Sequence, residues 1–186
     1  MTNITKEAVI EQIIATFREY GYEGASLSLL SKATGLGRSS LYHHFPKGKE
    51  DMANAALDAV MVSFDQLVLS PLRQTQKTSD QRVRACAKGL SEFYASGSNS
   101  CLINIFSVGT AGKMFQPYLE KRTQGLIGVF ADLAKETGVS TKEAKKRGEN
   151  LVIQIQGALV LSRTLNSNTP FKTLVKNIPE LLLHSV

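Results

Sequence analysis

Glycine and proline divide this chain into long segments in which apolar residues recur every three or four positions. This spacing places apolar side chains along one face of a helix, whereas a strand needs an apolar and polar alternation that no segment sustains. The pattern therefore predicts an all-α protein of about nine helices. We expect helices over residues 6–20, 27–34, 38–44, 50–69, 81–95, 102–108, 117–137, 141–165 and from 169 onward.

Several of these boundaries carry specific signals. Thr5 is the expected N-cap of the first helix, which buries Tyr20 and stops at Gly21, and Ser140 with Glu143 forms a capping box. Residues 70–80 have almost no apolar content, so we expect a mobile connection there. Pro179 interrupts the last helix, which should bend or restart at that point.

The composition is that of an ordinary globular protein. The 186 residues are 42% hydrophobic and 20% charged, which is compatible with one large domain or a small module joined to a larger one. No stretch has the ~18 consecutive apolar residues of a membrane span, and the N-terminus lacks the apolar run of a signal peptide. We therefore expect a cytoplasmic protein that does not contact membranes.

Basic residues outnumber acidic residues by 22 to 16, so the formal net charge is +6. A basic protein favours contact with a polyanion, but the net charge does not identify which one. The distribution is more informative, because residues 24–49 contain cations and histidines but no acid, while acids stand on both sides of this window.

The same window contains two short helical segments separated by Gly35-Leu36-Gly37, and a long helix follows it. Glycine takes a positive φ without a Cβ clash, so two glycines within three residues allow a sharp turn. Three short helices before a long one, with a glycine turn between the second and third, are typical of a helix-turn-helix whose third helix faces outward.

The stretch GYEGASLSLLSKATGLGRSSLYHHFPKGKEDM resembles the DNA-binding signature of the TetR family of transcriptional repressors. The matched elements are Gly21-Tyr22, Ser26, Leu30, Ala33, Gly35-Leu36, Ser40-Leu41-Tyr42-His43-His44-Phe45 and Lys49-Glu50. The resemblance covers about residues 5–55. It implies a helix-turn-helix DNA-binding domain over residues 1–49 and a ligand-binding and dimerisation domain over residues 50–186, connected through the long fourth helix.

The resemblance also implies the DNA contacts, and the chemistry of the side chains supports them. Polar residues on the first turns of a helix in the major groove reach base edges, while flanking residues contact phosphate. Arg38 is the expected reader of a guanine, whereas Leu41 and Phe45 point into the core. The predicted DNA-binding residues are Ser26, Ser28, Gly37, Arg38, Ser39, Tyr42, His43, His44 and Lys49.

Some of these roles have alternatives. Tyr42 can instead be a packing residue, and His44 a structural histidine. Gly37 stands where a serine often caps the recognition helix, and Ser39 replaces a frequent glycine. The link Pro46-Lys47-Gly48-Lys49 is one residue longer than usual, which leaves open whether Lys47 or Lys49 contacts phosphate; we favour Lys49. The longer link, together with Cys101-Leu102 after Gly97-Ser98-Asn99-Ser100, resembles a multidrug-type branch of the family.

In the C-terminal part, aromatic and polar residues are candidates for a ligand pocket, although such residues are more often plain core. The predicted pocket residues are Phe93, Ile105, Phe106, Phe115, Tyr118, Arg122, Phe130 and Gln154. The helix at 141–165 is apolar on more than one face and so needs two partners. With the last helix it can form a homodimer interface, for which we predict Ala158, Leu161, Ser162, Leu174, Ile178 and Leu182; the alternative is that both helices lie in the monomer core.

These observations predict a transcriptional regulator, a repressor released from a pseudo-palindromic double-stranded DNA operator by a small apolar or aromatic inducer. The histidine and cysteine spacings match no metal site, and we expect neither a cofactor nor an enzyme, since HExxH, Gly-rich phosphate-loop and nucleophile motifs are lacking. The alternatives are a thiol-based redox regulator that uses Cys86 or Cys101 and, more remotely, a helical enzyme. Activation instead of repression also stays open.

Overall fold

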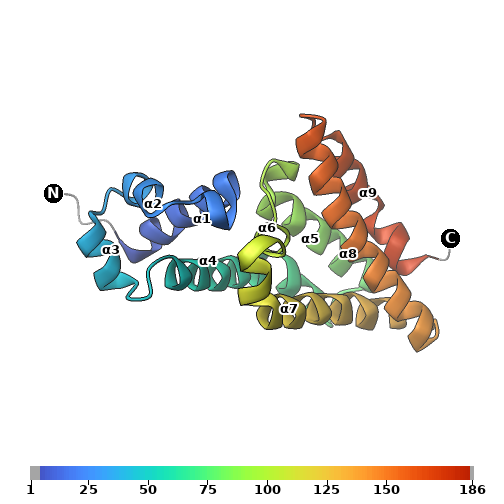
Figure 1. Ribbon diagram of the computed structural model, residues 1–186. Coiled ribbons are helices and arrows are strands. Elements are labelled where there is room, and N and C mark those ends of the chain that lie inside the picture. Colours follow the sequence, from blue (N-terminus) through green and yellow to red (C-terminus); the bar gives the residue numbers. More distant parts are fainter. Residues whose placement is uncertain (1–4, 185–186) are drawn as a thin grey trace. The chain divides into compact units, whose positions relative to one another are not determined.

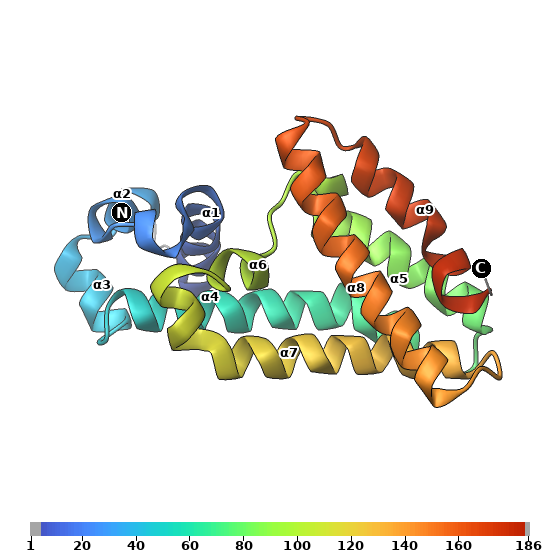
Figure 2. The same ribbon diagram turned by 45° about the vertical axis from the view of Figure 1, so that its right-hand side comes forward.

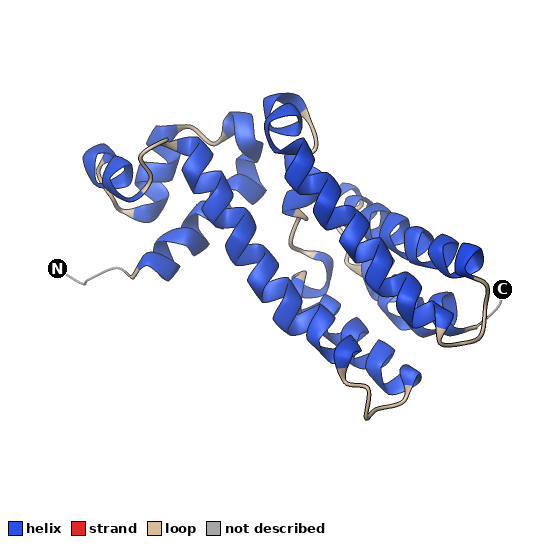
Figure 3. Cartoon of the chain, turned by 90° about the horizontal axis from the view of Figure 1, so that it is seen from below, coloured by secondary structure: helices blue, strands red, loops and turns tan. Residues whose placement is uncertain are grey.

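The computed structural model describes residues 5–184, and the regular elements in this part of the chain are all helical (Figures 1 and 3). The prediction of an all-α fold with nine α-helices is confirmed for the described residues. The helices are α1 (Lys6–Gly24), α2 (Leu27–Thr34), α3 (Arg38–His44), α4 (Lys49–Phe64), α5 (Ser79–Phe93), α6 (Leu102–Phe106), α7 (Gly109–Lys135), α8 (Thr141–Thr164) and α9 (Thr169–Leu183).

The chain forms two compact units. The N-terminal unit comprises residues up to Val62 together with Leu102–Gln116, and the C-terminal unit comprises residues 63–101 and those from Pro117 onward. The predicted division at residue 49 falls where α4 begins, and the N-terminal unit extends beyond it. The reason is that most of α4, all of α6 and the start of α7 pack with the N-terminal helices.

Helix α1 begins as expected, because the Thr5 hydroxyl accepts a hydrogen bond from the Ala8 N–H at 3.3 Å. At Gly21 the backbone takes φ 70°, which interrupts the regular helix before its last residues. The prediction that Tyr20 is buried is wrong, since its side chain is 45% exposed. The chain turns at Gly21, and Tyr22 enters the core instead, where its ring stacks on Phe17 at 5.9 Å between centroids.

The long helix that begins at Lys49 changes its winding before it ends. The α-helix stops at Phe64, a π-helical turn follows over Asp65–Leu69, and a 3-10 turn covers Ser70–Arg73. The first residues of the expected mobile connection are therefore helical, and Leu72 among them is buried. The burial of Leu72, whose carbonyl also accepts from Arg82 at 2.9 Å, anchors this turn, which the polar composition of the segment did not suggest.

By length and composition alone, the helical segment Lys49–Arg73 could cross a membrane, because it contains a window of mean hydropathy 1.3. This segment was not expected from the sequence. Core helices of soluble proteins pass the same test, so one such helix is weak evidence. Here a third of the window is buried against the protein itself, including Met52, Ala56 and Leu57, which accounts for part of its apolar composition.

Two other helices differ from the prediction at a proline. Helix α7 begins at Gly109 instead of residue 117, so Pro117 lies inside the helix. Proline lacks only one backbone N–H, and its would-be acceptor belongs to the exposed Lys113, which water can reach. Helix α9 likewise runs through Pro179 without restarting.

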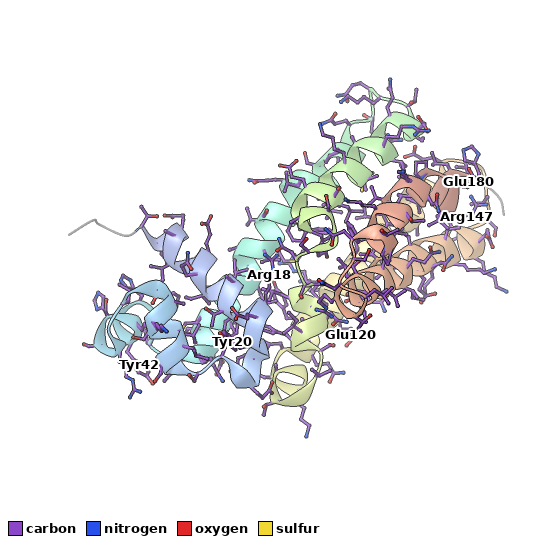
Figure 4. The ribbon with its side chains drawn as sticks, turned by 90° about the horizontal axis from the view of Figure 1, so that it is seen from above. Arg18, Tyr20, Tyr42, Glu120, Arg147 and Glu180 are labelled. Atoms are coloured by element: carbon purple, nitrogen blue, oxygen red, sulfur yellow. The ribbon has the colours of Figure 1, made fainter. Side chains whose placement is uncertain are left out.

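In the C-terminal unit, α9 lies along both α8 and α5 (Figure 2). Phe130 of α7, Leu151 of α8 and Phe171 of α9 are fully buried in the core of this unit. Arg147 is also buried and donates to the Leu182 carbonyl at 3.2 Å, near the C-terminal end of α9 where Glu180 lies (Figure 4). An open, mostly apolar groove of about 650 Å³ lies between α8 and α9.

Candidate nucleic-acid interface

The turn between α2 and α3 is held by local hydrogen bonds. The Ser26 hydroxyl caps α2 by accepting from the Leu29 N–H at 3.2 Å, and Gly35 ends α2 in the left-handed conformation at φ 69°. The Ser31 hydroxyl then donates to the Leu36 carbonyl at 2.6 Å. Glycine at position 35 is needed because a side chain rarely tolerates this φ. These contacts define the direction in which α3 leaves the turn.

Helix α3 buries one side and exposes the other. Leu41 and Phe45 are almost completely buried, as expected. The opposite side presents polar and aromatic side chains to solvent, namely Arg38, Ser39, Tyr42, His43 and His44. Gly37 is the N-cap of α3 and supplies no side-chain hydrogen bond to it, so the first backbone N–H groups of the helix are not covered by a hydroxyl. The exposed side of α3 therefore presents many hydrogen-bond donors to solvent.

The side chain of Arg38, the predicted base reader, is hydrogen-bonded to another side chain. Its Nη2 atom donates to the Ser28 Oγ atom at 3.0 Å, and both side chains are exposed. The sequence analysis placed both residues at the interface but did not connect them, because they belong to different helices.

Tyr42 is partly exposed and partly packed, so its position is compatible with both roles that the sequence left open. Its side chain is 46% exposed and projects from α3 in Figure 4. One edge of the ring lies against Gly48, where a Cβ atom would come within 3.2 Å of Tyr42 Cε1. The glycine, which also has φ 63°, thus makes room for the ring and fixes its direction.

The side chains of Lys47 and Lys49 differ in how accessible they are to a phosphate. The Lys49 ammonium donates to the Tyr22 carbonyl at 2.8 Å and lies 4.5 Å from the centroid of the Tyr22 ring, so it is engaged inside the protein. Lys47 is exposed, and its backbone N–H donates to the Asp51 carboxylate at 2.7 Å. Lys47 therefore has the side chain that is available to a phosphate, whereas the sequence analysis favoured Lys49.

The positive charge at this surface is local. Acidic and basic residues balance in the N-terminal unit, and the excess of cations lies in the C-terminal unit. The helices α2 and α3 nevertheless contain no acid, and Lys32, Arg38 and Lys47 are all exposed on or beside them. An attraction for a polyanion thus follows from the acid-free window and not from the net charge.

One polar contact that supports the module was not predicted from the sequence. The Glu23 carboxylate accepts from the Thr110 N–H at 2.7 Å and from the Thr110 hydroxyl at 2.6 Å, at the N-terminal end of α7. The hydroxyl hydrogen bond from Thr110, helped by backbone N–H groups, holds the pKa of Glu23 below its ordinary value. Because the partners are far apart in sequence, no local pattern indicates this cap.

The predicted pocket residues are divided between the two compact units. Ile105, Phe106 and Phe115 belong to the N-terminal unit, where Phe106 and Phe115 stack at 5.5 Å and pack around Tyr22. The other five lie in the C-terminal unit. Of these, Phe93 and Phe130 are buried, Arg122 lies over the Tyr118 ring at 5.1 Å, and Gln154 lines the groove between α8 and α9.

The predicted interface residues also separate into two groups. Ser162, Ile178 and Leu182 are buried in the core of the C-terminal unit and are not on its surface; the Ser162 hydroxyl accepts from the Phe171 N–H. Ala158, Leu161 and Leu174 line the groove between α8 and α9, where Leu161 is exposed and the other two are largely covered. The apolar residues of α9 repeat with a helical period on the inner side as well, which is why the sequence did not separate the groups.

The two cysteines are both buried. Burial raises the pKa of the Cys86 thiol to about 12, so its reactive thiolate form is disfavoured near neutral pH. Among the described residues, no group of three or more His, Cys, Asp or Glu side chains is arranged to hold a metal ion.

The fold and the exposed third helix define a helix-turn-helix regulator. Residues 9–56 match the family described as "Bacterial regulatory proteins, tetR family". The chain is 26% identical over 183 residues to the HTH-type transcriptional regulator LmrA of Bacillus subtilis (strain 168), which covers 96% of each chain. Residues 9–56 therefore form a DNA-binding domain of the TetR family, and the chain is a DNA-binding transcriptional regulator.

Solved structures share the fold across the whole chain. A TetR transcriptional regulator from Legionella pneumophila is similar with a TM-score of 0.81 at 16% identity, covering 98% of this chain and 100% of that one. A cysteine mutant of the TetR family regulator CifR, complexed with 26 bp double-strand operator DNA, has a TM-score of 0.70 at 18% identity and covers 98% and 97% of the two chains.

Proposed function

We propose that this regulator reads a pseudo-palindromic operator with α3 and represses transcription until a small apolar or aromatic ligand releases it. The exposed side of α3 carries the proposal, since it presents Arg38, Ser39, Tyr42 and His43 beside an acid-free surface. Arg38 donates two hydrogen bonds to a guanine, while Ser26, Tyr42, His44 and Lys47 hold the phosphates around it. The protein acts in the cytoplasm, where its operator is.

In vitro selection from a random DNA pool tests this function. The selected site should contain two half-sites related by symmetry, about one helical turn or slightly more apart. Arg38→Ala should lose discrimination between the selected operator and scrambled DNA, because one bidentate base contact is worth ~1–3 kcal/mol of discrimination. Lys47→Ala should weaken binding to both DNAs and reduce the salt slope by about 0.9. Equal loss on both DNAs for Arg38→Ala would make it a phosphate contact.

The same protein functions as a homodimer through the groove between α8 and α9. Two-fold symmetry of an operator needs a two-fold dimer, and the groove offers an exposed apolar surface that a second copy of the chain would cover. Ile153 and Leu161 of α8 are 65% and 52% exposed beside it, and Leu165 is exposed next to the end of the helix. Large apolar side chains that share one face are typical of a protein interface.

Release by a ligand requires that the ligand bind better to a conformation with a misplaced α3. A thermal-shift screen of neutral and anionic aromatic compounds, followed by operator competition, tests this part. Hits that stabilise the protein but leave operator affinity unchanged would contradict ligand-controlled release. Turnover of any hit would favour the enzyme alternative, and loss of operator binding on oxidation of wild type, absent after Cys86→Ser and Cys101→Ser, would favour the thiol alternative.

A further inference from the structure

The hydrogen bond from Arg38 to Ser28 joins the first turns of α2 and α3, ten positions apart in the sequence. We infer that Ser28 is a positioning residue, which orients the Arg38 guanidinium for base reading and does not itself hold a phosphate. This inference rests on the proposed function, because it takes Arg38 as the base reader. It replaces the phosphate role that the sequence analysis gave to Ser28.

The backbone around this pair is held at a constant geometry. Leu30 of α2 and Leu41 of α3 are buried in the same unit, and the turn between the helices is closed by the hydrogen bond from Ser31 to the Leu36 carbonyl. The Thr34 hydroxyl also accepts from the Leu36 N–H at 3.4 Å. Because both helix starts are anchored, a hydrogen bond between their side chains restricts Arg38 and does not merely follow its motion.

The chemistry of the guanidinium allows both contacts at once. It carries five N–H donors in one plane, and Ser28 takes a single one of them on Nη2. The remaining N–H groups still offer two parallel donors to the O6 and N7 acceptors of a guanine. A long arginine side chain loses much rotamer freedom when it binds, so a partner that restricts it beforehand increases the affinity for the matching base.

The two serines at the start of α2 thus have different roles. The Ser26 hydroxyl caps the helix through the Leu29 N–H, whereas the Ser28 hydroxyl accepts from Arg38. Ser28 carries no charge, and one of its acceptor positions is occupied in the free protein. These are the properties of a group that directs a cation rather than one that anchors the DNA backbone.

The positioning can be measured first without DNA. Side-chain ¹⁵N NMR of the full chain reports how fast the Arg38 guanidinium rotates, and we expect faster rotation in Ser28→Ala than in wild type. Ser28→Thr keeps the hydroxyl and should resemble wild type. If Arg38 rotates equally fast in wild type and in Ser28→Ala, the inference is overturned, whether or not the protein binds an operator.

The second measurement is DNA binding, in the wild-type and Arg38→Ala backgrounds. Ser28→Ala should weaken operator binding roughly 2- to 10-fold, the usual range for one lost hydrogen bond, and leave binding to scrambled DNA unchanged. In the Arg38→Ala background it should have no further effect, since the two residues act as one unit. Equal loss on both DNAs, or the same loss in both backgrounds, would overturn the inference.

These results separate the inference from the proposed function. Failure of the proposed function would appear as the absence of any selected DNA sequence for the wild-type protein, and the NMR comparison would still decide the role of Ser28. Since Ser28 is exposed, Ser28→Ala should melt at the wild-type temperature, so a loss of binding does not reflect unfolding.

Discussion

At the scale of single residues, the DNA-binding module depends on contacts that orient its polar side chains. Lys49 is held on the Tyr22 carbonyl, Arg38 on Ser28, and Glu23 on the first turn of α7. An anionic carboxylate at a helix N-terminus is favoured by the unpaired N–H groups and by the helix dipole. Glu23 therefore couples a helix of the DNA-binding module to the start of α7 within one compact unit.

This contact predicts a pH effect. The pKa of Glu23 is lowered in the folded protein, so the unfolded state binds the proton more readily; the stabilisation is fully present above the unfolded pKa and is lost as the pH falls through the folded pKa. As the pH falls below about 4.3, the melting temperature of wild type should decrease, and that of Glu23→Gln should decrease less. Thermal unfolding of both proteins from pH 3 to pH 7 measures the difference. Parallel curves for the two proteins would show that the carboxylate charge does not contribute.

At the scale of elements, the π-helical turn over Asp65–Leu69 depends on a glycine in the neighbouring helix. A Cβ atom at Gly89 of α5 would lie 1.8 Å from the Leu67 carbonyl oxygen, so the two backbones approach each other too closely for any side chain. The Arg73 guanidinium forms an ion pair with Asp65 at 2.5 Å and so links the start of this π-helical turn to the 3-10 turn that follows it.

Gly89→Ala should therefore destabilise the protein, by the ~1–3 kcal/mol or more that overpacking costs, because backbone atoms must shift to admit the methyl group. Gly125→Ala in α7 is the matched control: nothing lies within 4 Å of its Cβ position, and the change should stabilise the helix by up to ~1 kcal/mol. Denaturant titration of both variants measures these effects. A Gly89→Ala protein as stable as the control would contradict the close approach.

At the scale of the whole molecule, the groove between α8 and α9 is the surface that we assign to the dimer. Leu161→Glu should dissociate it, since symmetry buries two like charges near each other, and the exposed position lets the monomer fold. Val108→Glu is the control, because Val108 is even more exposed but does not line the groove. Sedimentation velocity of both variants gives the oligomeric state. A Leu161→Glu protein that stays dimeric would place the interface elsewhere.

Features that depend on neighbours in sequence could be predicted from the sequence. The limits of α2 and α3 agree with the predicted ranges. The Thr5 and Ser26 hydroxyls each cap a helix by accepting from the backbone N–H three positions later, so both caps depend on local sequence. The buried side of α3 followed from the spacing of Leu41 and Phe45. The acid-free window and the glycine turn are likewise properties of a short stretch of chain, which is why they identified the DNA-binding module.

Features that depend on distant residues were decided only by the tertiary structure. The Lys49 ammonium meets a carbonyl 27 positions away, and Glu23 meets Thr110 87 positions away. Ile178 and Leu182 are apolar like the groove residues, yet they face the core, because only the packing of α9 on α8 and α5 selects which apolar face is covered. The spacing of apolar residues indicates that a helix has an apolar face, and only long-range contacts determine what packs against that face.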